Sequence, residues 1–152
     1  MDSKQVAVWV VVAAMGIVGM GCGLDSKLGL APNGGTPALM TRTLISKEDG
    51  GYKIQFSLQD DQRLDTRASG MLRVTFVDYS DTTQTYYTDG QRVEKGDFKK
   101  YQTALGAEVW AYVFVVPNAN VPKYGSNTVA KMKLHFELDS GAVFEDEDSF
   151  SL

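Results

Sequence analysis

The sequence predicts an all-β fold, an antiparallel β-sandwich of about seven or eight strands. From about residue 39 onward apolar and polar residues alternate with period two, the pattern of strands with one buried face. Short runs that combine Asp with Gly separate these segments, and both residues favour tight turns. No segment shows a helical pattern longer than about one turn, so the crossover helices of a parallel sheet are not expected.

Four segments carry the strand pattern most clearly. They are residues 52–58, 71–78, 108–116 and 129–138. The last segment alternates most regularly, and its polar side is formed by Lys131, Lys133, His135 and Glu137. Segment 108–116 is apolar on both faces, which predicts a central strand. Within it, Trp110 shares a face with Tyr112 and Phe114, so we expect this tryptophan to anchor the core.

Turn sequences divide the strands into hairpins. The runs "EDGG" at 48–51 and "DSGA" at 139–142 predict two tight turns. Asp89-Gly90 predicts a third turn, which would join "TQTYY" to "QRVEKGDF". Pro117 and Pro122 bracket a longer loop, and "KKYQTALG" at 99–106 is the one weak helical candidate. This spacing of strands and turns resembles immunoglobulin-like or fibronectin-like sandwiches in the broad sense, with a small closed barrel as the alternative.

The N-terminal segment differs from the rest of the chain. Residues 6–20 contain no charged or strongly polar side chain, which is unlike a core helix with a solvent-exposed face. Gly19, Met20 and Gly21 then precede Cys22, the only cysteine of the chain. A short charged start, an apolar stretch and small residues before a cysteine resemble the signal peptide of bacterial lipoproteins.

This resemblance implies that Cys22 is acylated and becomes the new N-terminus. Residues 1–21 would then be the signal peptide, 22–38 a flexible lipid-anchored tether rich in Gly, Pro and Asn, and 39–152 the sandwich domain. The residue after Cys22 is Gly23 and not an aspartate, which resembles the sorting signal of lipoproteins of the outer membrane. An uncleaved membrane anchor and a plain secretory leader remain as alternatives. All three place the domain outside the cytoplasm, in the cell envelope or beyond it.

No pattern in the domain predicts an enzyme. The sequence has no Gly-x-Ser-x-Gly elbow, and its single histidine, His135, is expected to lie on the surface. The net charge of -4 without a basic cluster argues against a nucleic-acid partner. We therefore expect a non-enzymatic interaction or structural module, with the membrane and other envelope proteins as its partners.

Two kinds of ligand site remain open as alternatives, and no other cofactor is expected. Calcium prefers carboxylate oxygens, and the candidate ligands are Asp78, Asp81, Glu145, Asp146, Glu147 and Asp148. A carbohydrate would stack on exposed aromatic rings, and the candidates near turns are Tyr86, Tyr87, Tyr101 and Tyr124.

Overall fold

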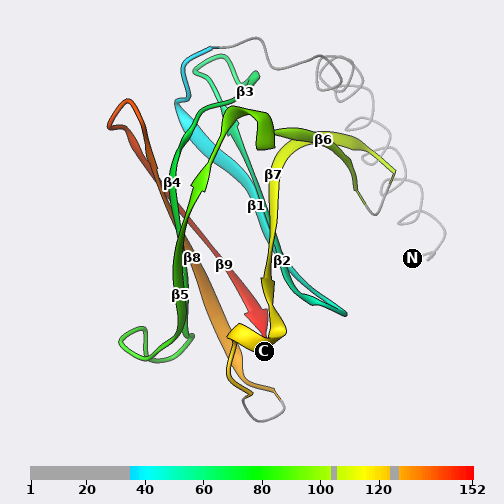
Figure 1. Cartoon of the computed structure of the whole chain (residues 1–152), viewed down its shortest axis with the longest axis vertical. Helices are drawn as coiled ribbons and strands as arrows, with labels where there is room; N and C mark the ends of the chain where they lie inside the picture. The colour runs from blue at the N-terminus through cyan, green and yellow to red at the C-terminus, as the bar shows by residue number, and fades with distance from the viewer. Residues whose placement is uncertain (1–34, 104–105, 124–126) are drawn as a thin grey trace, which may run out of the picture.

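The computed structural model describes residues 35–103, 106–123 and 127–152, which form two antiparallel sheets packed face to face (Figure 1). The first sheet contains β1 (Leu39–Glu48), β2 (Gly51–Gln59), the two-residue β3 (Asp65–Thr66), β6 (Lys99–Gln102) and β7 (Glu108–Pro117). The second contains β4 (Gly70–Asp78), β5 (Thr85–Val93), β8 (Val129–Leu138) and β9 (Val143–Ser151). Two short 3₁₀ turns, η1 (Lys95–Asp97) and η2 (Asn118–Asn120), complete the described chain. Within these residues, no helix has the length and apolarity needed to span a membrane.

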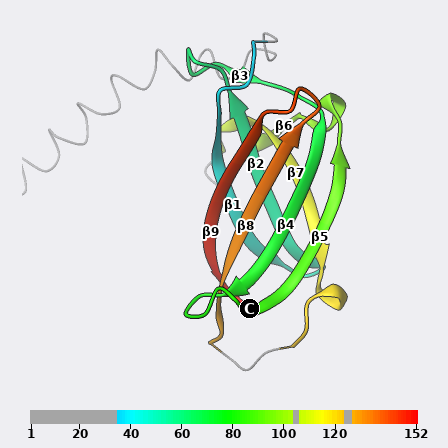
Figure 2. The same cartoon turned by 90° about the vertical axis from the view of Figure 1, so that its left-hand side faces the viewer.

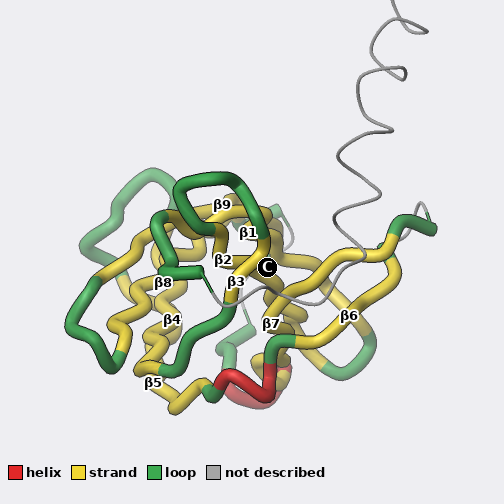
Figure 3. The backbone as a smooth tube through the Cα atoms, turned by 90° about the horizontal axis from the view of Figure 1, so that it is seen from above, coloured by secondary structure: helices red, strands yellow, loops and turns green. Residues whose placement is uncertain are grey.

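The strand order confirms the predicted β-sandwich. The first sheet runs β1-β2-β7-β6, with β3 paired to β2, and the second runs β5-β4-β8-β9. With one extra edge strand, this is the arrangement of immunoglobulin-like sandwiches, in which ABED packs on CFG. Figure 3 shows the two layers end on, with η1 crossing from one layer to the other. Every pair of neighbouring strands described is antiparallel.

Aromatic rings fill the space between the sheets, where the alternating pattern predicted the core. Phe56 of β2 and Phe136 of β8 are both fully buried, and their ring centroids lie 5.6 Å apart in a T-shaped contact. Tyr112 of β7 stacks on Phe56 at 4.9 Å. Trp110 is only half-buried and packs against the edge of this core, 6.0 Å from the ring of Phe98. The predicted anchor role of Trp110 is therefore filled mainly by Tyr112.

A buried tyrosine also joins the two sheets by hydrogen bonds. The Tyr112 hydroxyl donates to the carbonyl oxygen of Ala68 at 2.6 Å and accepts from the Ala68 N–H at 2.9 Å. Burial raises the pKa of Tyr112 to about 12. Because Ala68 precedes β4, these bonds fix the start of the second sheet against the centre of the first.

Two of the predicted hairpins are confirmed and the third is wrong. β1 and β2 meet at 48–51, and β8 and β9 are joined at 139–142, where Gly141 has a φ of 86°. Asp89-Gly90 instead lies inside β5, where Asp89 pairs with Val74 and neither residue has positive φ. The chain reverses further on, at η1, where a capping box between Glu94 and Asp97 replaces the Asp-Gly turn.

The weak helical expectation for residues 99–106 is also wrong. Residues 99–102 form β6, and Lys100 pairs with Trp110 of β7. The pairing with an apolar neighbouring strand outweighs the small local preference for a helix. Figure 1 shows the β6–β7 hairpin projecting sideways from the body of the sandwich.

A groove on the outer face of the second sheet as candidate functional site

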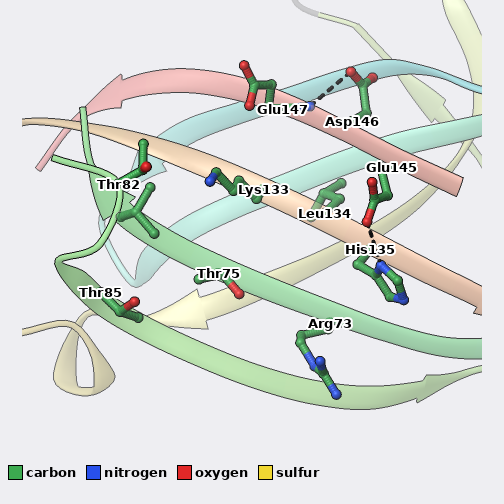
Figure 4. A pocket seen from close by; sticks show the side chains of 11 residues that line it. Arg73, Thr75, Thr82, Thr85, Lys133, Leu134, His135, Glu145, Asp146 and Glu147 are labelled. Carbon is green, nitrogen blue, oxygen red and sulfur yellow. Dashed lines mark hydrogen bonds and ion pairs between the residues drawn. The ribbon is translucent and has the colours of Figure 1, made fainter. Parts of the chain in front are cut away.

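A hollow on the described surface lies on the outer face of the β5-β4-β8-β9 sheet (Figure 4). Its volume is about 710 Å³, within the range of small-molecule pockets. We call it the outer-face groove and define it by Arg73, Thr75, Thr82, Thr85, Lys133 and His135, with the acidic side chains of β9 along one side. The period-two alternation explains its polarity, because residues of opposite parity fill the core.

Strand register sorts the groove residues into rows that run across the sheet. In the first row, Gly90 of β5 lies beside Arg73 of β4, then His135 of β8, then Glu145 of β9. His135 Nδ1 lies 2.8 Å from Glu145 Oε1, so this histidine is hydrogen-bonded to a carboxylate and partly exposed. Gly90 has no side chain to cover its neighbour. The Arg73 side chain is exposed and makes no hydrogen bond or ion pair with any described residue.

The second row contains a further cation without a partner. It runs from Thr88 through Thr75 and Lys133 to Glu147. Glu147 accepts instead from Lys131, whose Nζ lies 2.8 Å from Glu147 Oε1. Lys133 is half-buried and has no ion pair with any residue of the described ranges. The groove therefore holds two cationic side chains on neighbouring strands that make no ion pair, beside the carboxylates of Glu145, Asp146 and Glu147.

The β4–β5 loop borders one end of the groove and is organised by two aspartates. Asp78 Oδ1 accepts from the N–H of Ser80 and of Asp81, each at 2.8 Å, and from the Ser80 hydroxyl at 2.6 Å. Its other oxygen accepts from the Tyr86 hydroxyl. The Ser80 hydroxyl, followed by that of Tyr86, holds the pKa of Asp78 far below its usual range. Asp81 in the same way accepts from the Thr83 N–H and hydroxyl.

This low pKa predicts that acid loosens the loop. The folded chain releases the Asp78 proton more readily than the unfolded chain, whose value is near 3.8. The native state is therefore stabilised above that pH, and the effect is lost as pH falls through the folded value. We expect the urea midpoint to fall when pH drops from neutral to below 3.8, and to fall less in Asp78→Asn. Asp61→Asn, at an exposed position, is the control, and an equal acid response in both variants would contradict the assignment.

The acidic residues proposed as calcium ligands lie apart and have other partners. Asp78 and Asp81 hold the β4–β5 loop, whereas the other four candidates lie along β9. Glu145 and Glu147 point outward, Glu145 to a hydrogen bond with His135 and Glu147 to an ion pair with Lys131. Asp146 and Asp148 are half-buried on the inner side, where Asp148 Oδ2 accepts from the N–H of Ile45 of β1 at 3.2 Å. The described residues contain no group of three or more metal-ligating side chains placed to hold an ion.

The three candidate tyrosines that the structure describes do not share a surface. Tyr86 is 9% exposed and packs in the core, so its ring is covered. Tyr87 lies 5.3 Å from the ring of Phe76, and its hydroxyl contacts Asp89. Tyr101 lines a separate small hollow beside β6. Tyr124 lies outside the described residues.

The predicted processing site cannot be placed in the fold. Gly19, Met20, Gly21 and Cys22 all lie outside the described residues. The residues of the outer-face groove, in contrast, are described by the structure. The sequence predicted that they lie on polar faces of strands, but not that they lie together. The alternation within 71–78 and 129–138 indicates that Arg73 and Lys133 point outward. The pairing of these two segments, which lie far apart in the chain, is what brings them together.

Comparison with known proteins gives no family for this chain. No protein-family model matches the sequence, and no curated protein matches it closely. Solved structures that resemble the fold include OgpA from Akkermansia muciniphila, with TM-score 0.49 and 13% identity over 78% of this chain. A hypothetical protein from Pyrococcus horikoshii has TM-score 0.41 and 11% identity, covering 84% of this chain and 98% of its own. The chain spans only 29% of the OgpA chain, and none of these similarities assigns it a function.

Proposed function

We propose that this protein is a lipid-anchored β-sandwich of a bacterial cell envelope, a non-enzymatic module that binds its partner through the outer-face groove. The groove is the observation that carries the binding role, because it gathers Arg73 and Lys133, two cationic side chains without ion pairs, beside threonine hydroxyls in one hollow. Most other cations of this sheet, such as Lys131 and Arg92, are paired with carboxylates. Surface charges held without partners and beside hydroxyl groups are suited to binding a ligand.

The ends of the sandwich support an anchored orientation. The described chain starts at Gly35, whose carbonyl oxygen accepts from the Thr66 hydroxyl of β3. Figure 2 shows this end of the sandwich beside the β8–β9 turn, with the β4–β5 loop at the opposite end. A tether between Cys22 and Gly35 would therefore join the sandwich at the end opposite the loop of Thr82, which borders the groove.

Lipidation of Cys22 is the step of this proposal that mass spectrometry tests directly. We expect the membrane-extracted protein to have lost residues 1–21 and to carry acyl groups. Cys22→Ser should lack the acyl mass, because the thiol that would carry the acyl chains is gone. Ser26→Ala, a neighbouring change in the tether, is the control and should match the wild type.

Two other results would replace the lipid anchor with a different attachment. Retention of Met1 in both the wild type and Cys22→Ser, with both proteins in the membrane, would identify an uncleaved membrane-spanning anchor. Loss of the leader without added acyl mass would identify a secreted domain. Either result leaves the binding role of the groove to be tested separately.

A further inference from the structure

Two Asp-Gly dipeptides of the described chain lie in contrasting environments. Asp49-Gly50 forms the turn between β1 and β2, whereas Asp89-Gly90 lies inside β5. In an Asp-Gly sequence the main-chain nitrogen of the glycine can attack the side-chain carboxyl group of the aspartate, because glycine has no Cβ to hinder the approach. Both dipeptides carry the groups for this reaction, so the fold decides which of them reacts.

The reacting groups of Asp49-Gly50 are exposed and free. Neither the Asp49 carboxylate nor the Gly50 N–H makes a hydrogen bond or ion pair with any described residue. Asn118 holds the turn through its carbonyl oxygens instead, since its N–H donates to Gly50 and its side-chain amide to Asp49, each at 3.3 Å. Apart from its chain neighbours, no described atom lies within 4 Å of where a Cβ of Gly50 would stand. The carboxyl group and the nitrogen therefore have room to approach each other.

The same groups of Asp89-Gly90 are held in place. Asp89 Oδ2 accepts from the Tyr87 hydroxyl at 3.2 Å, and Oδ1 accepts from the Gly90 N–H at 2.8 Å. In this arrangement the nitrogen presents its hydrogen to the carboxylate and not its electrons to the carboxyl carbon. Both residues also pair with β4, so the main-chain rotation needed for attack would separate β5 from β4.

We propose that Asp49 is a site of spontaneous isoaspartate formation, and that the pairing of β5 with β4 protects Asp89. The Gly50 nitrogen forms a bond to Asp49 Cγ, and the neutral carboxyl group loses its hydroxyl, which leaves as water together with the amide proton. The product is a five-membered succinimide. Water then adds to either ring carbonyl and breaks its bond to the nitrogen, which gives aspartate again or isoaspartate. The reaction releases one water and takes one up, and it needs no other reactant.

Isoaspartate would change the β1–β2 hairpin where the chain reverses. The main chain then runs through the side-chain carbon of residue 49, which lengthens a turn whose two residues set the pairing of Glu48 with Gly51. We expect the bonds from Asn118 to be lost as well. Because β1 is an edge strand, the change would loosen one end of the first sheet without removing its central strands.

Incubation of the full chain in detergent, at neutral pH and physiological temperature, tests the proposal. Trypsin cleaves after Lys and Arg, so it releases the two dipeptides in separate peptides, residues 48–53 and 74–92. Isoaspartate in each peptide is measured by enzymatic methylation of its α-carboxylate and by electron-transfer fragmentation. We expect it to accumulate in peptide 48–53 and to stay at its starting level in peptide 74–92. After unfolding in urea both peptides should accumulate it at similar rates, because strand pairing no longer holds Asp89.

Gly50→Ala is the variant that tests the chemistry of the turn. Its φ is not positive and its Cβ would meet open space, so the fold should be kept, as circular dichroism checks. The added methyl group hinders attack by the nitrogen, and we expect isoaspartate at Asp49 to form several-fold more slowly. Gly96→Ala also places a Cβ in open space, far along the chain in η1, and should keep the wild-type rate at Asp49.

Three results would overturn the proposal. The first is an absence of isoaspartate at Asp49 after incubation of the folded protein. The second is its formation at Asp89 as fast as at Asp49 in the folded protein, which would show that strand pairing gives no protection. The third is an equal rate at Asp49 in Gly50→Ala and the wild type, which would exclude attack by this nitrogen.

Discussion

Replacing Phe56 with Ala is expected to destabilise the sandwich by about 3–5 kcal/mol, because it removes a buried ring and leaves a cavity. Phe56 is fully buried and contacts three other rings: Tyr112 at 4.9 Å, Phe136 at 5.6 Å and Phe114 at 6.4 Å. These rings come from β2, β7 and β8, so the loss affects both sheets. Domains of this size are stable by only about 5–15 kcal/mol. Urea unfolding followed by circular dichroism measures the change.

Two further variants keep this prediction testable if Phe56→Ala does not fold. Phe56→Leu retains most of the side-chain volume and should cost about 1–1.5 kcal/mol. Gln55→Ala changes the adjacent residue, which points to the outer face, and should shift stability by only about 0.5 kcal/mol. If Phe56→Leu and Gln55→Ala were equally destabilising, the ring cluster around Phe56 would not be the centre of the core.

The sequence predicted the sandwich because half of each strand is buried. Tyr52, Ile54, Phe56 and Leu58 alternate with polar residues, and all four are at most 4% exposed. The turn prediction at Asp89-Gly90 was wrong because this dipeptide favours a turn only when its residues take positive φ. In β5 it is instead held extended by pairing with β4. Pairing with β4 therefore outweighed the local turn preference of Asp89-Gly90.

The candidate site was predictable only in part, for a related reason. Asp78 and Asp81 were predicted as candidate calcium ligands, but their oxygens accept hydrogen bonds from their own loop. Such bonds between a side chain and nearby backbone cannot be distinguished from metal ligation by composition. Arg73 and Lys133 have no carboxylate partner because, across β8 and β9, Glu147 contacts Lys131 and Glu145 contacts His135. Sequence alone does not provide that register.

Replacing Gly70 with Ala is the second change with a large expected effect. Gly70 begins β4 between two neighbours, pairing with Val93 of β5 and Leu138 of β8. A Cβ atom at this position would lie 2.2 Å from the carbonyl oxygen of Glu137 and 2.8 Å from the Cα of Leu138. Both are backbone atoms of β8, so no side-chain rotation relieves the overlap. We expect a loss of about 3 kcal/mol in the free energy of unfolding.

Gly90→Ala is the matched control, since Gly90 also lies in this sheet. The nearest atom to a Cβ there is the carbonyl oxygen of Leu72 at 3.8 Å, an ordinary contact. An alanine at that position reduces the freedom of the unfolded chain, so stability should stay equal or rise by about 0.5 kcal/mol. Thermal unfolding of both variants separates the two positions. If Gly70→Ala were tolerated as well as Gly90→Ala, β4 and β8 would not approach this closely, and the register that places Arg73 beside His135 would have to be revised.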